Sequence, residues 1–180
     1  MTPRFEIIEA RAYHCGQMAR ILRHEHQKAV AMIGIDSHRE LRGRFDDSSF
    51  RKAWLIDGKL AALGGVTGSL LSTVGYIWLA FSNEAMRYPI QIVKESRLQI
   101  AEIMTVKTTI YTTILDGDEA SKRFAIFVGF VPADDERQSP ATSRFGRMDL
   151  ARRFDQNTEA RIAVGKGYAI ALCHQRQEAA

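Results

Sequence analysis

The chain has 180 residues, of which 46% are hydrophobic and 26% charged, a composition that excludes a disordered or fibrous segment and predicts one domain over residues 1–180. The net charge is +4, but the basic residues are spread among the acids, so nucleic acid is not an expected partner. No apolar run approaches the ~18 residues of a membrane helix, and the N-terminal MTPRFEIIEA does not resemble a signal peptide, so we expect a cytoplasmic location and no membrane partner.

The first third of the chain predicts a strand followed by two helices. Residues 5–10, FEIIEA, alternate in polarity and favour a strand. Residues 12–34 carry apolar side chains near helical spacing, apart from one polar interruption, and predict a single helix that stops at Gly34. Asp36 is a typical N-cap and predicts a short second helix over residues 37–45.

The next section predicts a β-hairpin and a central strand. Two apolar runs within residues 50–67 are joined by Asp57 and Gly58, a pair that hairpin turns prefer. Residues 74–81, VGYIWLAF, are apolar almost throughout, which is typical of a strand covered on both faces. We therefore expect this fourth strand in the middle of the sheet.

A long helix then begins near Tyr88, with Pro89 suited to its first turn. Residues 108–115, TTIYTTIL, are rich in β-branched side chains and predict a fifth strand. Asp118 is placed to cap the helix that follows, and Gly129 is placed to end it before a short strand.

The last part of the chain predicts less regular structure. The stretch after Pro132 is polar and predicts a loop or an insertion. Residues 148–165 have a helical pattern, and residues 167–175, GYAIALCHQ, predict a last strand. Residues 133–180 are thus a loop plus a last strand, or an extension of the domain.

This order of elements resembles that of the GNAT-type N-acetyltransferases, from about residue 4 to residue 132. Many members end their catalytic region with N-x-x-A-x-x-(L/F)-Y-x-x-x-G-F, and this chain places Phe124, Gly129 and Phe130 in that register. The resemblance implies an α/β (α+β) fold with a central mixed, mostly antiparallel sheet of roughly six or seven strands, about four flanking helices and a V-shaped splay after the fourth strand.

A narrower resemblance is to acetyltransferase-like proteins of tailed phages, including the small internal virion proteins of short-tailed phages. It lies in the passage GYIWLAFSNEAMRYPIQIVKESRL, which is similar to their strand, short loop and proline-led helix. It implies a phage or prophage origin, with the host cytoplasm or the virion as location and other virion proteins as partners.

The GNAT resemblance also implies where acetyl-CoA would bind. In that family the cofactor lies beside the fourth strand and its pyrophosphate meets the start of the next helix, where a Q/R-x-x-G-x-G/A motif lets the backbone approach. Arg87 stands at the leading basic position, but Ile90 and Ile92 replace the glycines and Pro89 removes a donor. The expected cofactor-binding residues are Leu79, Ala80, Phe81, Arg87, Tyr88, Ile90 and Phe124.

The catalytic groups that the resemblance implies are altered as well. The family tyrosine that protonates the departing thiolate falls at Ala125, so Tyr111 is the candidate substitute, with Tyr88 at the helix start as the alternative. The fourth strand contains no acid, which leaves Glu84, just past its end, as the nearest candidate base for an amine, with Glu102 on the long helix second. A first-turn acid that favours the helix dipole is the alternative role for Glu84.

Nothing in the sequence predicts a metal site. His24 and His26 point about 200° apart on a helix, and ligands on one helix need a spacing of three or four residues. Cys15 and Cys173 belong to no CxxC pair.

Three functions are consistent with these patterns. The first is a GNAT-type, acetyl-CoA-dependent N-acyltransferase, a transferase with a degenerate cofactor loop that acts on a small-molecule or protein amine and could form a homodimer. The second is a catalytically inactive phage structural or internal virion protein of the same fold. The third is an acyl-CoA or small-molecule binding protein without turnover.

Overall fold

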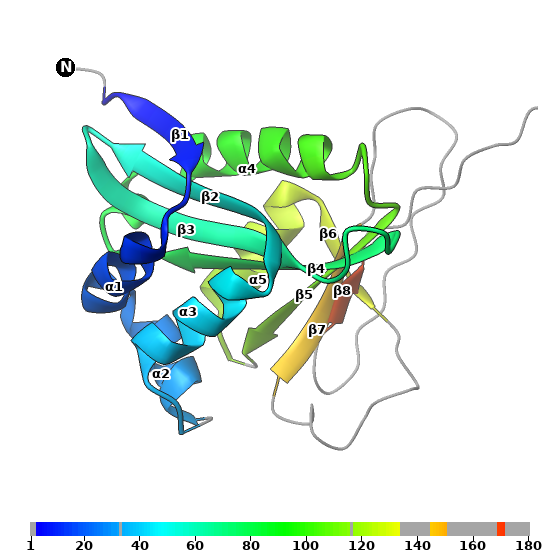
Figure 1. The fold of residues 1–180 in the computed structure, drawn as a ribbon, viewed down its shortest axis with the longest axis horizontal. Coiled ribbons are helices and arrows are strands. Elements are labelled where there is room, and N and C mark those ends of the chain that lie inside the picture. The colour runs from blue at the N-terminus through cyan, green and yellow to red at the C-terminus, as the bar shows by residue number, and fades with distance from the viewer. Residues whose placement is uncertain (1–2, 33, 116, 134–144, 151–168, 172–180) are drawn as a thin grey trace, which may run out of the picture. The chain divides into compact units, whose positions relative to one another are not determined.

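The structure is a computed structural model that describes residues 3–32, 34–115, 117–133, 145–150 and 169–171 (Figure 1). The chain divides into two units, one formed by Met1–Leu70 with Ile77–Ile92 and the other by Leu71–Tyr76 with Val93–Ala180. In the part that the structure describes, no helix is long and apolar enough to cross a membrane.

The first unit is built on the predicted hairpin. Strand β2 (Ser48–Ile56) pairs antiparallel with β3 (Lys59–Thr67) on one side and with β1 (Phe5–Glu9) on the other. Asp57 and Gly58 both have positive φ, at 49° and 74°, which is the two-residue turn that the sequence predicts. Strand β4 (Val74–Phe81) is the next neighbour of β3, and the predicted central place of this strand is confirmed.

Three helices belong to this unit: α1 (Ala12–Ile21), α2 (His24–Met32) and α3 (Ser37–Asp46). The prediction of one helix over residues 12–34 is wrong, because Leu22 has an extended ψ of 136° and forms an antiparallel bridge with Ser82. A backbone bonded to a strand cannot continue the helical hydrogen bonds. The predicted cap of α3 is confirmed, since the Asp36 carboxylate accepts from the backbone of His38 and Arg39 at 2.9 and 3.2 Å.

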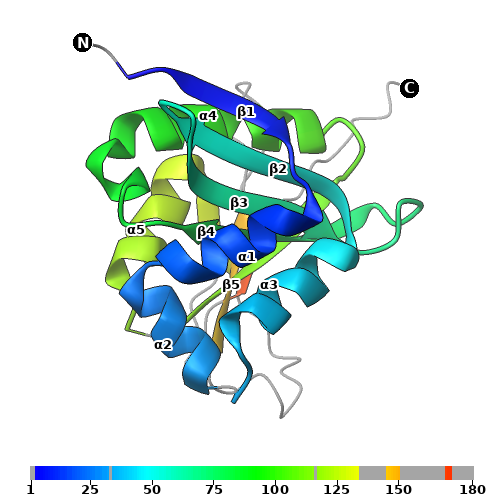
Figure 2. The same ribbon diagram turned by 60° about the vertical axis from the view of Figure 1, so that its left-hand side comes forward.

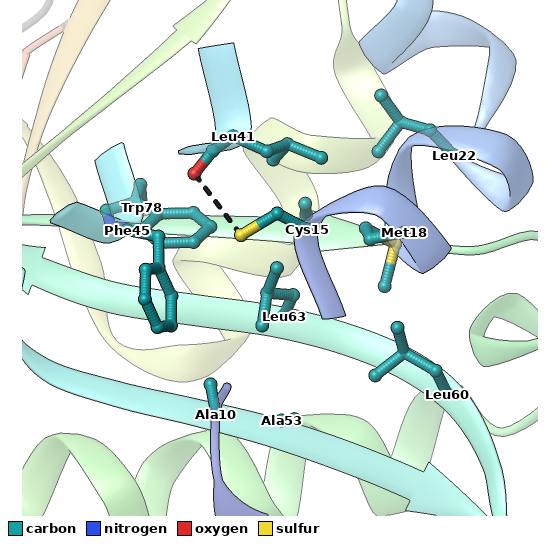
Figure 3. Close-up of a cluster of buried hydrophobic side chains, with 11 residues drawn as sticks. Ala10, Cys15, Met18, Leu22, Leu41, Phe45, Ala53, Leu60, Leu63 and Trp78 are labelled. Atoms are coloured by element: carbon teal, nitrogen blue, oxygen red, sulfur yellow. Dashed lines mark hydrogen bonds between the residues drawn. The ribbon is translucent and has the colours of Figure 1, made fainter. Parts of the chain in front are cut away.

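Helices α1 and α3 pack against each other and against β3 (Figure 2), and the core of the unit lies between them and the sheet. Figure 3 shows its buried side chains around Cys15, whose Sγ lies 3.8 Å from the carbonyl oxygen of Leu41. The helical members are Cys15, Met18, Leu41 and Phe45, and the strand members include Ala53, Leu60, Leu63 and Trp78. Cys15 and Trp78 are both buried and thus have structural places in this core.

The second unit contains the start of β4, helix α4 (Pro89–Ile103) from Val93 onward and the elements after it. Helix α4 leads to β5 (Thr109–Leu115), α5 (Glu119–Val128) and the strands β6 (Phe130–Ala133), β7 (Phe145–Leu150) and β8 (Ala169–Ala171). The parallel ladder between β4 and β5 joins Val74–Tyr76 to Thr109–Tyr111, and the splay expected beyond it stays a prediction.

The predicted ends of α5 are confirmed. The Asp118 carboxylate accepts from the backbone N and the Oγ of Ser121 at 3.0 and 2.7 Å, and Gly129 adopts a left-handed φ of 109°.

The expected fold class is confirmed, with two differences in detail. The described sheet is mixed, with one parallel pairing among antiparallel ones, but it has eight strands rather than six or seven. The additional strand is β7, whose residues Met148–Leu150 pair with β6, so the predicted helix over residues 148–165 is wrong at its start. The rest of that prediction, and Cys173, lie outside the described residues. The break between α1 and α2 accounts for the fifth α-helix.

Candidate functional site

The expected cofactor-binding residues of β4 are Leu79, Ala80 and Phe81, and most of their side-chain surface is buried. Ala80 and Phe81 are buried, and the ring of Phe81 lies 6.3 Å from that of Trp54. Leu79 is half-buried and lies against Gly64, where an added Cβ would come within 2.8 Å of its Cδ1. The side chains of Ala80 and Phe81 are thus buried on opposite faces of the strand, and of the three residues only Leu79 is partly exposed.

Ser82–Tyr88, which we call the cofactor turn, connects β4 to α4 and contains the 3-10 helix η1 (Ala85–Arg87). The backbone N–H groups of Met86, Arg87 and Tyr88 donate to the carbonyl oxygens three residues earlier, at 3.2, 3.1 and 3.1 Å. The N–H of Ala85 donates to Ser82 Oγ at 3.3 Å. Four consecutive donors are thus satisfied within the turn.

Glu84 and Arg87 form an ion pair on the outer side of this turn. Arg87 Nη1 lies 3.2 Å from both carboxylate oxygens of Glu84, and the Arg87 side chain is 69% exposed. The hydrogen bond to Glu84 raises the pKa of the Arg87 guanidinium further above its usual range, so Arg87 keeps its charge. The turn therefore presents a permanent cation beside a carboxylate.

The remaining candidates near the start of α4 have different environments. The half-buried ring of Tyr88 meets that of Phe5 edge-on at 5.6 Å. Ile90 is 85% exposed, whereas Ile92 is 1% exposed. One face of the helix thus turns Ile92 into the core and leaves Ile90 on the surface, and the replacement of the family glycines by these two residues stays a prediction.

Tyr111 and Phe124 belong to the second unit, whereas the candidates of the cofactor turn belong to the first. Tyr111 lies opposite Tyr76 in the β4–β5 ladder, and their rings stack with centroids 5.5 Å apart. Phe124 is a half-buried residue of α5. Its neighbour Ala125 is 3% exposed, so a small buried side chain occupies the position of the family tyrosine. The catalytic role of Tyr111 stays a prediction.

Two residues that contact the cofactor turn were missed by the sequence analysis. The Nη1 atom of Arg23 lies 3.9 Å from Sδ of Met86, and Leu22 forms an antiparallel bridge with Ser82 of the turn. The available signal was the polar interruption of the helical spacing in residues 12–34. Among the residues that the structure describes, no group of three or more His, Cys, Asp or Glu side chains is placed to hold a metal ion.

Solved structures with a similar fold are acetyltransferases. Aminoglycoside acetyltransferase AAC(6')-Ib in complex with coenzyme A has a TM-score of 0.55 and 13% identity, with 73% of this chain and 86% of that chain covered. PaiA N-acetyltransferase from Thermoplasma acidophilum in complex with coenzyme A has a TM-score of 0.55 and 11% identity, with 74% and 94% covered. An acetyltransferase of the GNAT family from Streptococcus pneumoniae has a TM-score of 0.50 and 12% identity, with 79% and 95% covered.

No protein-family model matches the sequence, and the search of curated proteins found no match. The structural similarities at this level of identity show the fold alone. The chain has the fold of the GNAT acetyltransferases.

Proposed function

We propose that the chain is an acyl-CoA-dependent N-acyltransferase, with acetyl-CoA as the donor and a small-molecule or protein amine as the acceptor. The observation that supports it most is the exposed cation Arg87 on the connection between β4 and α4, in a fold shared with two acetyltransferases solved in complex with coenzyme A. A guanidinium binds phosphate oxygens two at a time, which suits a pyrophosphate.

The cofactor turn fits these phosphates through a side chain rather than through a backbone cradle. The N–H groups of Met86, Arg87 and Tyr88 already donate within the turn, and Pro89 has no N–H. Arg87 is exposed and charged, so it can reach a phosphate without rearrangement of the backbone. The degenerate cofactor loop of our proposal is therefore one in which Arg87 replaces the main-chain donors.

Acetyl-CoA would supply the acyl group as a thioester. The amine nitrogen forms a bond to the acyl carbon, the carbon–sulfur bond breaks, and the sulfur leaves as a thiolate that takes up a proton. In this proposal Glu84 accepts the proton that the amine loses, and Tyr111 is the candidate donor to the thiolate. Glu84 can act as a base only when its carboxylate is released from Arg87, which binding of phosphate to Arg87 would favour.

Binding of the cofactor is the first test. At a hundred times its dissociation constant, acetyl-CoA should raise the free energy of unfolding by about 2.7 kcal/mol. Arg87→Ala should weaken calorimetric binding by roughly 10-fold or more, as expected for a charge-assisted hydrogen bond. Arg42→Ala is the matched control, because Arg42 is an exposed arginine paired with Asp46 on α3. No stabilisation at millimolar acetyl-CoA would rule out the proposal.

Turnover is tested separately by release of free thiol in the presence of amine acceptors. Tyr111→Phe keeps the ring that stacks on Tyr76 and removes only the hydroxyl, so a fall in kcat at unchanged KM would support Tyr111 as the proton donor. Binding without thiol release would support the acyl-CoA binding protein instead. The phage origin, a place in the virion and a homodimer stay predictions, and genes for tail or portal proteins beside this one would support the first two.

A further inference from the structure

The break between α1 and α2 lies against one edge of strand β4. Leu22 forms its bridge with Ser82, and the N–H of Arg23 donates to the carbonyl oxygen of Phe81 at 2.9 Å. The N–H of Ser82 donates at 2.9 Å to Ala61 of β3. Since successive backbone groups of a strand point to opposite edges, Leu22 and Arg23 lie on the edge of β4 that faces away from β3.

Ser82 links this break to the cofactor turn. It is buried, and its Oγ accepts the N–H of Ala85, the first residue of η1. The backbone of Ser82 is held between β3 and Leu22, so the main chain that carries this hydroxyl is fixed from two sides. The start of η1 is thereby tied to the residues where α1 ends.

The side chain of Arg23 lies against the same turn. It is only 7% exposed, and its Nη1 lies 3.9 Å from Sδ of Met86, the middle residue of η1. Its Nε lies 3.4 Å from a carboxylate oxygen of Glu25, which is half-exposed. Burial of a guanidinium is costly, and an apolar side chain of similar length often fills such a space with equal or greater stability. Packing alone therefore does not account for an arginine beside η1.

We infer that Arg23 and Ser82 are positioning residues that hold the cofactor turn in the conformation that presents Arg87 and Glu84 to an acyl-CoA. The part of this inference that concerns acyl-CoA rests on the proposed function. The part that concerns the order of the turn does not, and it can be measured without any ligand.

Hydrogen exchange of the unliganded protein tests the order of the turn. The amides of Met86, Arg87 and Tyr88 donate within the turn and report its opening. In Arg23→Met they should exchange about 5- to 30-fold faster than in the wild type. The control is Val30→Ala, which shortens a buried side chain of α2 and should leave these amides unchanged. Arg23→Lys keeps the positive charge, so the exchange rates of these amides should lie between those of Arg23→Met and the wild type.

A kinetic measurement tests whether the ordered turn is needed for the reaction with acetyl-CoA. Arg23→Met should raise the KM for acetyl-CoA and, because the turn also carries Glu84, lower kcat, while Val30→Ala should change neither. Ser82→Ala is a second variant that leaves the guanidinium in place, and it should raise the exchange rate of Ala85 and the same KM.

The outcomes separate the inference from the proposed function. Unchanged exchange in both Arg23→Met and Ser82→Ala overturns the inference, whether or not the wild type binds acetyl-CoA. Faster exchange at an unchanged KM also overturns it, because the contacts would then serve folding only. A wild type that binds no acetyl-CoA overturns the proposed function, and faster exchange in the variants would still support the positioning of the turn.

Discussion

Trp78 of β4 donates a hydrogen bond from its indole Nε1 to the hydroxyl Oγ of Ser48, 2.8 Å away, and both residues are buried. The same hydroxyl donates to the carbonyl oxygen of Arg44 at 2.6 Å. One serine thus connects the strand before the cofactor turn to the last turn of α3 and the start of β2.

Ser48→Ala should lower the free energy of unfolding by about 1–3 kcal/mol, because it leaves a buried indole N–H and a carbonyl oxygen without this partner. Urea denaturation should show a lower midpoint at an unchanged slope. Ser49→Ala is the control, since Ser49 is only half-buried and its Oγ makes a longer bond of 3.2 Å to Val66. Equal losses in the two variants would contradict the assigned role of Ser48.

Gly65 and Gly43 should respond in opposite ways to substitution by alanine. At Gly65 an added Cβ would meet the carbonyl oxygen of Phe50 and lie 2.8 Å from Ser48 Oγ, so Gly65→Ala should cost about 1–3 kcal/mol. At Gly43, inside α3, nothing lies within 4 Å, and the alanine should stabilise by about 0.5–1 kcal/mol. Thermal unfolding of both variants checks the two signs, and destabilisation at Gly43 would contradict the open surface there.

His14 should make stability depend on pH. Its Nδ1 accepts the backbone N–H of Arg11 at 2.8 Å, and burial lowers the pKa of His14 below its ordinary value of 6.5. The folded state therefore favours the neutral ring. The contribution of the neutral ring to the free energy of unfolding is complete above pH 6.5 and is lost as the pH falls through the lowered pKa of His14 in the folded state. Urea midpoints from about pH 7.5 to pH 5 should fall less steeply for His14→Asn than for the wild type.

The exposed His24 supplies the control for this measurement. His24→Asn should keep the pH dependence of the wild type, since this side chain is exposed at the start of α2. Parallel curves for the wild type and His14→Asn would show that His14 does not titrate as described.

Glu84→Gln should separate binding from chemistry. Loss of the carboxylate removes a negative charge beside Arg87, so the affinity for acetyl-CoA should rise by a factor of up to about 5, as expected for an exposed ion pair. If Glu84 is the base, kcat should fall about 10²- to 10⁴-fold. Titration calorimetry and thiol release measure the two effects. Asp46→Asn removes the carboxylate of the control pair and should change neither, while an unchanged kcat in Glu84→Gln would exclude Glu84 as the base.

The sequence by itself determined the features that depend on neighbouring residues. The turn at Asp57 and Gly58, the cap at Asp118 and the stop at Gly129 each need only a local hydrogen bond or a positive φ. Residue type alone encodes these requirements, so they could be predicted without knowledge of the fold. The order of the elements followed from them, because hydrophobic periodicity changes at each such signal.

The tertiary structure decided the features that depend on residues far apart in the chain. The helix over residues 12–34 breaks at Leu22 because Ser82, sixty residues later, offers a strand edge to its backbone. The surroundings of Arg23 also depend on distant residues, because its side chain contacts Met86 and its backbone N–H donates to Phe81 at the end of β4. Helical spacing describes only what a segment would do alone, and a strand that supplies backbone hydrogen bonds elsewhere can override it.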